Sequence, residues 1–118
     1  MESTFILQKL KYESDTNYVL AERYYALLSA LNNMKLTERE IQLVAFTAVR
    51  GNISYANIRE DFCKRYGTTS PTINNMISKM KKLGVMIKTS GKVKVNPVLI
   101  LDFNKDVKLF ITFTHAEG

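Results

Sequence analysis

The sequence is poor in the residues that build metal sites, disulfides and nucleophilic active sites. Its 118 residues include one cysteine, Cys63, one histidine, His115, and no tryptophan. A single cysteine excludes an internal disulfide, and one Cys with one His excludes a Cys/His zinc cluster. The same scarcity leaves little room for a nucleophile paired with a base, and no glycine-rich phosphate loop is present. We therefore expect a non-enzymatic protein without a metal or cofactor, with Cys63 serving as a small core residue.

Long apolar runs and linker-like stretches are also missing. No run approaches the ~20 residues that a membrane span needs, and the N-terminal residues 1–4 lack the basic and apolar regions of a secretory signal. The chain has two prolines and five glycines, no internal repeat, and no segment rich in Pro, Gly or Ser. Its length is that of one domain. We therefore expect a single domain over residues 1–118, in the cytoplasm and without membrane contact.

Acidic residues are absent from one long segment, residues 62–101. This segment contains eight lysines and arginines, whereas the rest of the chain has nine against eleven acidic residues. The formal net charge of +6 therefore originates in this segment. Soluble surfaces usually mix charges of both signs, so a segment of one sign that is also patterned for folding indicates a polyanionic partner. The alternative is a basic face that serves only solvation.

Start and stop signals for four helices are found between residues 14 and 84. The expected helices have their start and stop signals at Ser14-Asp15-Thr16 to about Asn32, Thr37 to Gly51, Ser54 to Gly67, and Ser70-Pro71 to Gly84. The second start is the sharpest, because Thr37 and Glu40 form a capping box. In the first helix, an apolar stripe recurs at helical spacing: Leu20, Tyr24, Leu27, Leu28 and Leu31.

After Gly84 the apolar period changes from 3.6 to 2, which predicts strands. Residues 85–96 form a basic hairpin around the turn Ser90–Lys92, and further strands are expected over 4–12, 98–103 and 107–114. The predicted fold class is α+β, with about four helices, a basic β-hairpin, and extra N- and C-terminal strands. We expect a core at 36–97, preceded by a strand and helix over 4–33 and followed by strands over 98–114.

Two helices joined by a tight turn and followed by a basic hairpin resemble a winged helix-turn-helix domain. The string from Thr72 to Val85, TINNMISKMKKLGV, is similar to the end of the recognition helix in MarR-like regulators and in plasmid or phage replication proteins. The residues Lys94-Val95-Asn96-Pro97 are similar to the end of the wing in some plasmid replication proteins. This resemblance covers residues 36–97. It implies that the helix over 71–83 enters the major groove and that the wing over 85–96 contacts the DNA backbone.

The outer face of the helix over 71–83 carries side chains that suit a major groove. Asparagine can bond adenine N6 and N7 together, serine and threonine bond several base edges, and lysine reaches guanine or phosphate. Lysines near the hairpin turn can reach a neighbouring backbone, although protection of an exposed sheet edge would explain them equally. An ordinary amphipathic helix is the alternative for the helix itself. The candidate DNA-binding residues are Thr72, Asn74, Asn75, Ser78, Lys79, Lys81, Lys82, Lys88, Lys92 and Lys94.

The sequence thus predicts a protein that binds double-stranded DNA, either in transcription regulation or in plasmid or phage replication. A structural or adaptor module, for example a phage assembly component in the virion, is the competing hypothesis because fold does not fix function. Such a module would contact its protein partner through the flanking strands over 4–12 and 107–114. We also expect a homodimer through the N-terminal strand and helix, because Tyr18 and Tyr25 widen the apolar stripe there.

Overall fold

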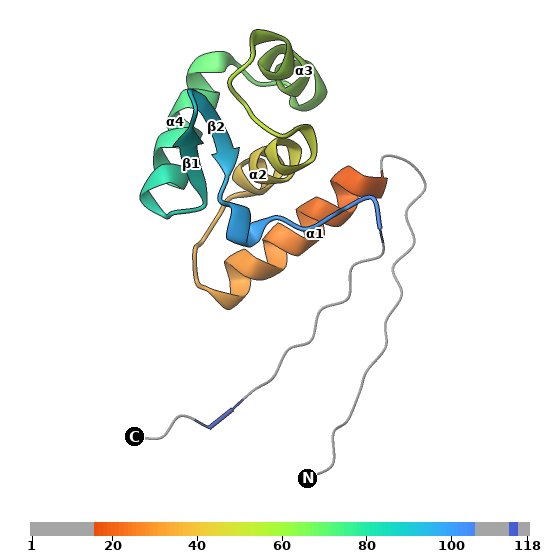
Figure 1. The fold of residues 1–118 in the computed structure, drawn as a ribbon, viewed down its shortest axis with the longest axis vertical. Helices are drawn as coiled ribbons and strands as arrows, with labels where there is room; N and C mark the ends of the chain where they lie inside the picture. The colour runs from red at the N-terminus through yellow and green to blue at the C-terminus, as the bar shows by residue number, and fades with distance from the viewer. Residues whose placement is uncertain (1–15, 106–113, 116–118) are drawn as a thin grey trace.

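The computed structural model describes residues 16–105, 114 and 115, and in these residues it has four α-helices and a two-stranded antiparallel sheet (Figure 1). The elements are α1 (Thr16–Leu31), α2 (Glu38–Arg50), α3 (Ala56–Tyr66), α4 (Ser70–Lys82), β1 (Met86–Thr89), β2 (Lys92–Val95) and the 3-10 turn η1 (Pro97–Leu99). This confirms the expected α+β composition of four helices and a hairpin. The strands expected over 4–12 and 107–114 lie outside the described residues, apart from Thr114, which is not in a strand.

Helix α2 forms the centre of the core, and both of its ends are fixed by local residues. The Thr37 hydroxyl accepts the Glu40 N–H at 3.2 Å, and the Glu40 carboxylate accepts the Thr37 N–H at 2.8 Å, which confirms the capping box. Gly51 ends the helix in the left-handed region, with φ of +97°, where glycine is favoured. Residues 43–47 are buried in succession, so α2 contacts neighbouring elements on most of its surface.

Helix α1 packs against α2, but its buried face is displaced by one residue from the expected stripe. Ala21, Tyr25 and Ser29 are buried, whereas Leu31 at the end of the expected stripe is half exposed. Leu20 and Leu28 of the expected stripe are partly buried and pack against the same core. The Tyr25 hydroxyl donates to the carbonyl oxygen of Leu99 at 2.8 Å, which ties α1 to the C-terminal segment.

The tyrosines of α1 make their contacts inside the chain. The Tyr18 ring stacks on Phe46 at 5.6 Å between centroids, and Tyr24 and Tyr25 lie 5.7 and 5.8 Å from the ring of Phe103. Intramolecular packing therefore explains these side chains without a second subunit. The homodimer stays a prediction, and the tyrosines no longer supply its reason.

The strand expected over 98–103 is wrong. Residues 97–99 form the 3-10 turn η1, and residues 100–105 have no strand pairing. Pro97 lacks the N–H that a ladder needs, and the Asn96 side chain accepts the Val98 N–H at 3.2 Å, so the backbone turns away from β2. Leu99 and Leu101 instead pack against the core and Phe103 is buried against α1, whereas Val98 and Ile100 stay exposed. The apolar residues of this run that are buried therefore pack on the core without forming a strand.

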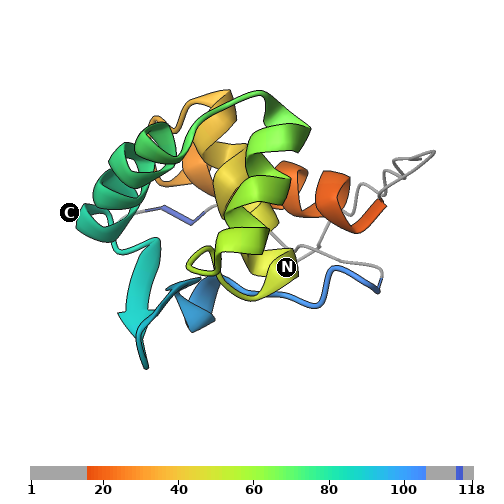
Figure 2. The same ribbon diagram turned by 90° about the horizontal axis from the view of Figure 1, so that it is seen from above.

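The hairpin has a two-residue turn and a defined register. Ser90 and Gly91 both have positive φ, +53° and +77°, as a type I′ turn requires. Met86 pairs with Val95, and Lys88 pairs with Val93. Met86, Val93 and Val95 are buried and attach the hairpin to the body, whereas its tip projects away from the helices (Figure 2).

The start of α3 differs from the expectation that Ser54 is its N-cap. The helix begins at Ala56, and its N-cap residue, Tyr55, makes no side-chain capping bond. The Ser54 hydroxyl instead accepts the Val93 N–H of β2 at 2.8 Å, and the Ile53 N–H donates to the Val93 carbonyl oxygen at 3.0 Å. The chain before α3 therefore lies along β2 and holds the hairpin in place.

Candidate nucleic-acid interface

Helices α3 and α4 are joined by a turn of three residues, 67–69. Gly67 ends α3 in the left-handed region, with φ of +63°. Helix α4 occupies 70–82 where 71–83 was expected, and its N-cap is Thr69, not Ser70. The reason is backbone conformation, because Thr69 is extended with φ of −126° and ψ of 159°, as an N-cap residue is. The Ser70 hydroxyl is thereby free to accept a hydrogen bond from α3.

Helix α4 buries one face and exposes the other, as its periodicity predicts. The buried side chains are Ile73, Met76, Ile77 and Met80. Leu83, the C-cap residue of α4, is 44% exposed, although the sequence places it on the apolar stripe of this helix. The exposed candidate residues are Thr72, Asn74, Asn75, Ser78, Lys81 and Lys82. The polar side chains selected from the sequence thus share one surface.

Several of these side chains have no partner in the described part of the chain. Asn75, Lys81 and Lys82 on α4, and Lys88 and Lys94 on the hairpin, make no side-chain hydrogen bond or ion pair with any described residue. Thr72 and Ser78 make only local bonds, from Thr72 to the Thr69 hydroxyl at 3.0 Å and from Ser78 to the Asn74 carbonyl oxygen at 3.2 Å. The surface therefore offers amide, hydroxyl and ammonium groups to a ligand.

Lys79, in contrast, is committed to an ion pair within the protein. Its Nζ lies 2.8 Å from Oε1 of Glu40, whose carboxylate is buried in the first turn of α2. Burial raises the pKa of the Glu40 carboxyl, but the hydrogen bonds from Lys79 and Thr37 lower it by more, so this pKa lies below its ordinary value. Lys79 thus connects α4 to α2, and a role in holding the fold competes with a role in binding.

Arg59, on α3, is a residue of this surface that the sequence did not single out. Its Nη1 donates to Oδ1 of Asn74 at 2.7 Å and to Oγ of Ser70 at 3.2 Å, and its Nε donates to the carbonyl oxygen of Ile53 at 2.9 Å. One guanidinium thus joins α3, the start of α4 and the segment that supports the hairpin. The contact crosses 15 positions between two helices, so no local spacing pointed to it.

A second missed residue, Tyr55, lies beside the hairpin. Lys92 Nζ is 5.0 Å from the centroid of the Tyr55 ring, and Tyr55 is 47% exposed. The contact is a cation–π interaction at the surface, worth about 0.5–1 kcal/mol at exposed sites. Lys92 therefore has an intramolecular partner, whereas Lys88 and Lys94 have none among the described residues.

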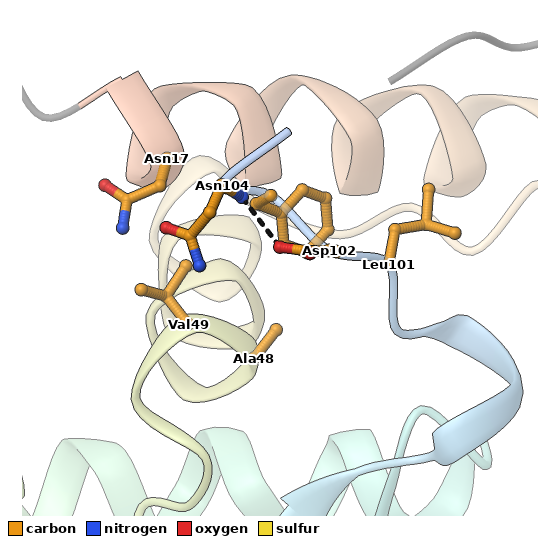
Figure 3. A pocket seen from close by; sticks show the side chains of 7 residues that line it. Asn17, Ala48, Val49, Leu101, Asp102 and Asn104 are labelled. Carbon is orange, nitrogen blue, oxygen red and sulfur yellow. Dashed lines mark hydrogen bonds between the residues drawn. The ribbon is translucent and has the colours of Figure 1, made fainter. Parts of the chain in front are cut away.

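The remaining hollows are poor candidates for a small-molecule site. Figure 3 shows one of about 70 Å³ between Asn17, Val49 and the C-terminal segment, where the Asn104 N–H donates to Asp102. A shallower hollow of about 430 Å³ lies between the ends of α1 and α4 and includes Leu83. The described residues contain no group of three His, Cys, Asp or Glu side chains that could hold a metal ion. Among the same residues, no helix has the length and apolar character needed to cross a membrane.

Helix α4 and the hairpin lie next to each other and carry the same sign of charge (Figure 1). Their exposed groups include hydrogen-bond donors, neutral acceptors and cations, and residues 62–101 supply no carboxylate. Such a surface attracts an extended anion and can distinguish its hydrogen-bonding groups. Comparison of the chain with protein-family models, curated proteins and solved structures finds no match.

Proposed function

We propose that this protein binds double-stranded DNA as a winged helix-turn-helix domain. In this proposal α3 and α4 form the helix-turn-helix, α4 enters the major groove, and the hairpin is the wing that contacts the backbone. The observation that carries the proposal is a group of lysines on α4 and the hairpin that have no partner among the described residues, in a segment without acidic residues: Lys81, Lys82, Lys88 and Lys94.

The outer face of α4 supports reading of bases as well as attraction to phosphate. Asn75 is exposed with both ends of its amide free of described partners, and Thr72 and Ser78 expose hydroxyls on the same helix. Asparagine is a poor helix former, so propensity alone gives little reason for Asn74 and Asn75 side by side in a helix. We infer a sequence-preferring protein of the cytoplasm, acting in transcription regulation or in plasmid or phage replication.

A salt titration of duplex binding tests the proposal. The full chain is titrated onto a fluorescently labelled random duplex, and anisotropy is read at several salt concentrations from 50 to 200 mM. Neutralisation of about five phosphates predicts a slope of roughly −4 to −5 for log K against log salt. Absence of binding at the lowest salt, or an affinity that does not change with salt, would overturn the proposal.

A non-enzymatic structural or adaptor module is the second candidate, and exposed apolar side chains favour it. Leu83, Val98 and Ile100 are 44%, 82% and 42% exposed, and the first two line the hollow between α1 and α4. Clustered apolar side chains at a surface are typical of protein contacts. The substitution Val98→Asp distinguishes the two candidates, because it should leave DNA affinity unchanged and abolish assembly through this surface.

A further inference from the structure

We infer that Arg59 restricts Asn74 to donating hydrogen bonds toward DNA, so that α4 selects a guanine at the base pair opposite Asn74. This inference rests on the DNA-binding function proposed above. It adds Arg59, a partly exposed residue of α3, to the determinants of sequence preference.

The hydrogen bond between these two residues fixes which end of the Asn74 amide faces Arg59. A guanidinium has five N–H donors and no acceptor. The Asn74 atom 2.7 Å from Arg59 Nη1 must therefore be the amide oxygen. The NH₂ group of Asn74 is consequently directed away from that contact, on a side chain that is exposed on the outer face of α4.

Arg59 is itself held, so the orientation of Asn74 is established before any ligand binds. Its Nε bonds the Ile53 carbonyl oxygen at 2.9 Å, and its Nη1 also reaches the Ser70 hydroxyl at 3.2 Å. Two further acceptors, one at the start of α4 and one in the segment before α3, thus fix the guanidinium. Preorganisation of this kind reduces the cost of ordering side chains on binding.

The base preference follows from the hydrogen-bonding groups in the major groove. An asparagine that reads adenine uses both ends of its amide, accepting from N6 and donating to N7. At Asn74 the oxygen already accepts from a cation, so the amino group of adenine would meet a second donor there. Guanine instead presents two acceptors, N7 and O6, which suit a donating amide beside a positive charge.

Asn75 provides the internal comparison. It is the next residue of α4, it is exposed, and its side chain makes no hydrogen bond with the described part of the chain. Both ends of its amide are available, so Asn75 suits adenine. Two adjacent asparagines are therefore expected to read different bases because only one of them contacts Arg59.

The test is selection of binding sites from a random duplex library, followed by anisotropy on matched duplexes. The full chain is compared with Asn74→Ala, Asn75→Ala and Arg59→Met, each checked for folding by circular dichroism. Asn74→Ala should reduce the preference for one guanine by about fivefold or more, and Asn75→Ala should reduce that for an adenine elsewhere in the site. Arg59→Met should move the position read by Asn74 from guanine toward adenine.

The outcomes distinguish failure of the role inferred for Arg59 from failure of the proposed DNA binding. A selected site in which Asn74→Ala keeps the full guanine preference, or in which the Asn74 position is already adenine, overturns the role of Arg59 and leaves DNA binding intact. No selected site together with no salt-dependent binding overturns both. If Arg59→Met does not fold, the comparison of Asn74→Ala with Asn75→Ala decides alone.

Discussion

The ammonium group of Lys79 and the backbone N–H of Thr37 are bound by the same oxygen of Glu40, each at 2.8 Å. The residue that completes the capping box of α2 therefore also holds α4 against α2. Glu40 is almost fully buried, whereas the Lys79 side chain is 41% exposed. Local helix capping and long-range packing thus depend on one carboxylate.

Replacement of Lys79 by Met should destabilise the fold more than it weakens DNA binding. Removal of the ammonium leaves a buried carboxylate without its cation, and the partial exposure of Lys79 limits the loss to about 1–2 kcal/mol. Urea denaturation of the wild type and the variant measures this difference. A stability equal to that of the wild type would mean that the ion pair contributes nothing and that Lys79 is free for a ligand.

The stability contributed by Glu40 should disappear in acid. Its folded pKa lies below the ordinary value of 4.5, so its contribution is present above that pH and is lost as the pH falls through the folded pKa. Glu40→Gln keeps a side chain that suits a capping box but does not titrate. The wild type should exceed this variant in free energy of unfolding at pH 7, and the gap should narrow below about pH 4.5. A gap that is independent of pH would contradict the assignment.

Removal of a lysine from α4 should weaken binding to every duplex sequence alike. Lys82→Ala is expected to reduce the magnitude of the salt slope by about 1, because one phosphate contact is lost. Lys105→Ala is the matched control, since Lys105 is an exposed lysine on the C-terminal segment that lies against α1. Anisotropy at two salt concentrations measures both. Equal effects of the two substitutions would mean that net charge, and not the surface of α4, determines affinity.

Tyr25→Phe should weaken the attachment of the C-terminal segment to α1. The ring contacts with Phe103 stay, but the carbonyl oxygen of Leu99 loses its donor, at a cost of about 1 kcal/mol. Burial raises the pKa of Tyr25, with a smaller increase from Tyr24, so the wild type should also lose stability above pH 10 as the unfolded chain ionises. Denaturation at pH 7 and pH 11 checks both effects. The variant should lose less stability between these two pH values.

Features that depend on neighbours in sequence were predictable from this chain. The capping box needs only Thr37 and Glu40, three positions apart, and the hairpin turn needs only Ser90 and Gly91. The exposed face of α4 followed from its periodicity. These predictions succeeded because hydrogen bonds and side-chain direction within one element are set by local geometry.

Contacts between distant elements could not be read in this way. Ser54 matches the pattern of an N-cap, but its hydroxyl binds Val93, which lies 39 positions away. Arg59 and Asn74 are each ordinary residues of a helix until α3 and α4 are placed together. The apolar run over 98–103 has no periodicity that separates a strand from a segment packed on a helix. In each case the contact forms only when elements distant in sequence pack against each other.

Asn17 and Asn104 line the same small hollow, so the two ends of the described range 16–105 lie close together (Figure 3). Residues 16 and 105 lie at the same end of α1, on the side remote from α4 (Figures 1 and 2). A fluorophore attached at the start of α1 or at residue 105 is therefore placed away from α4 and the hairpin.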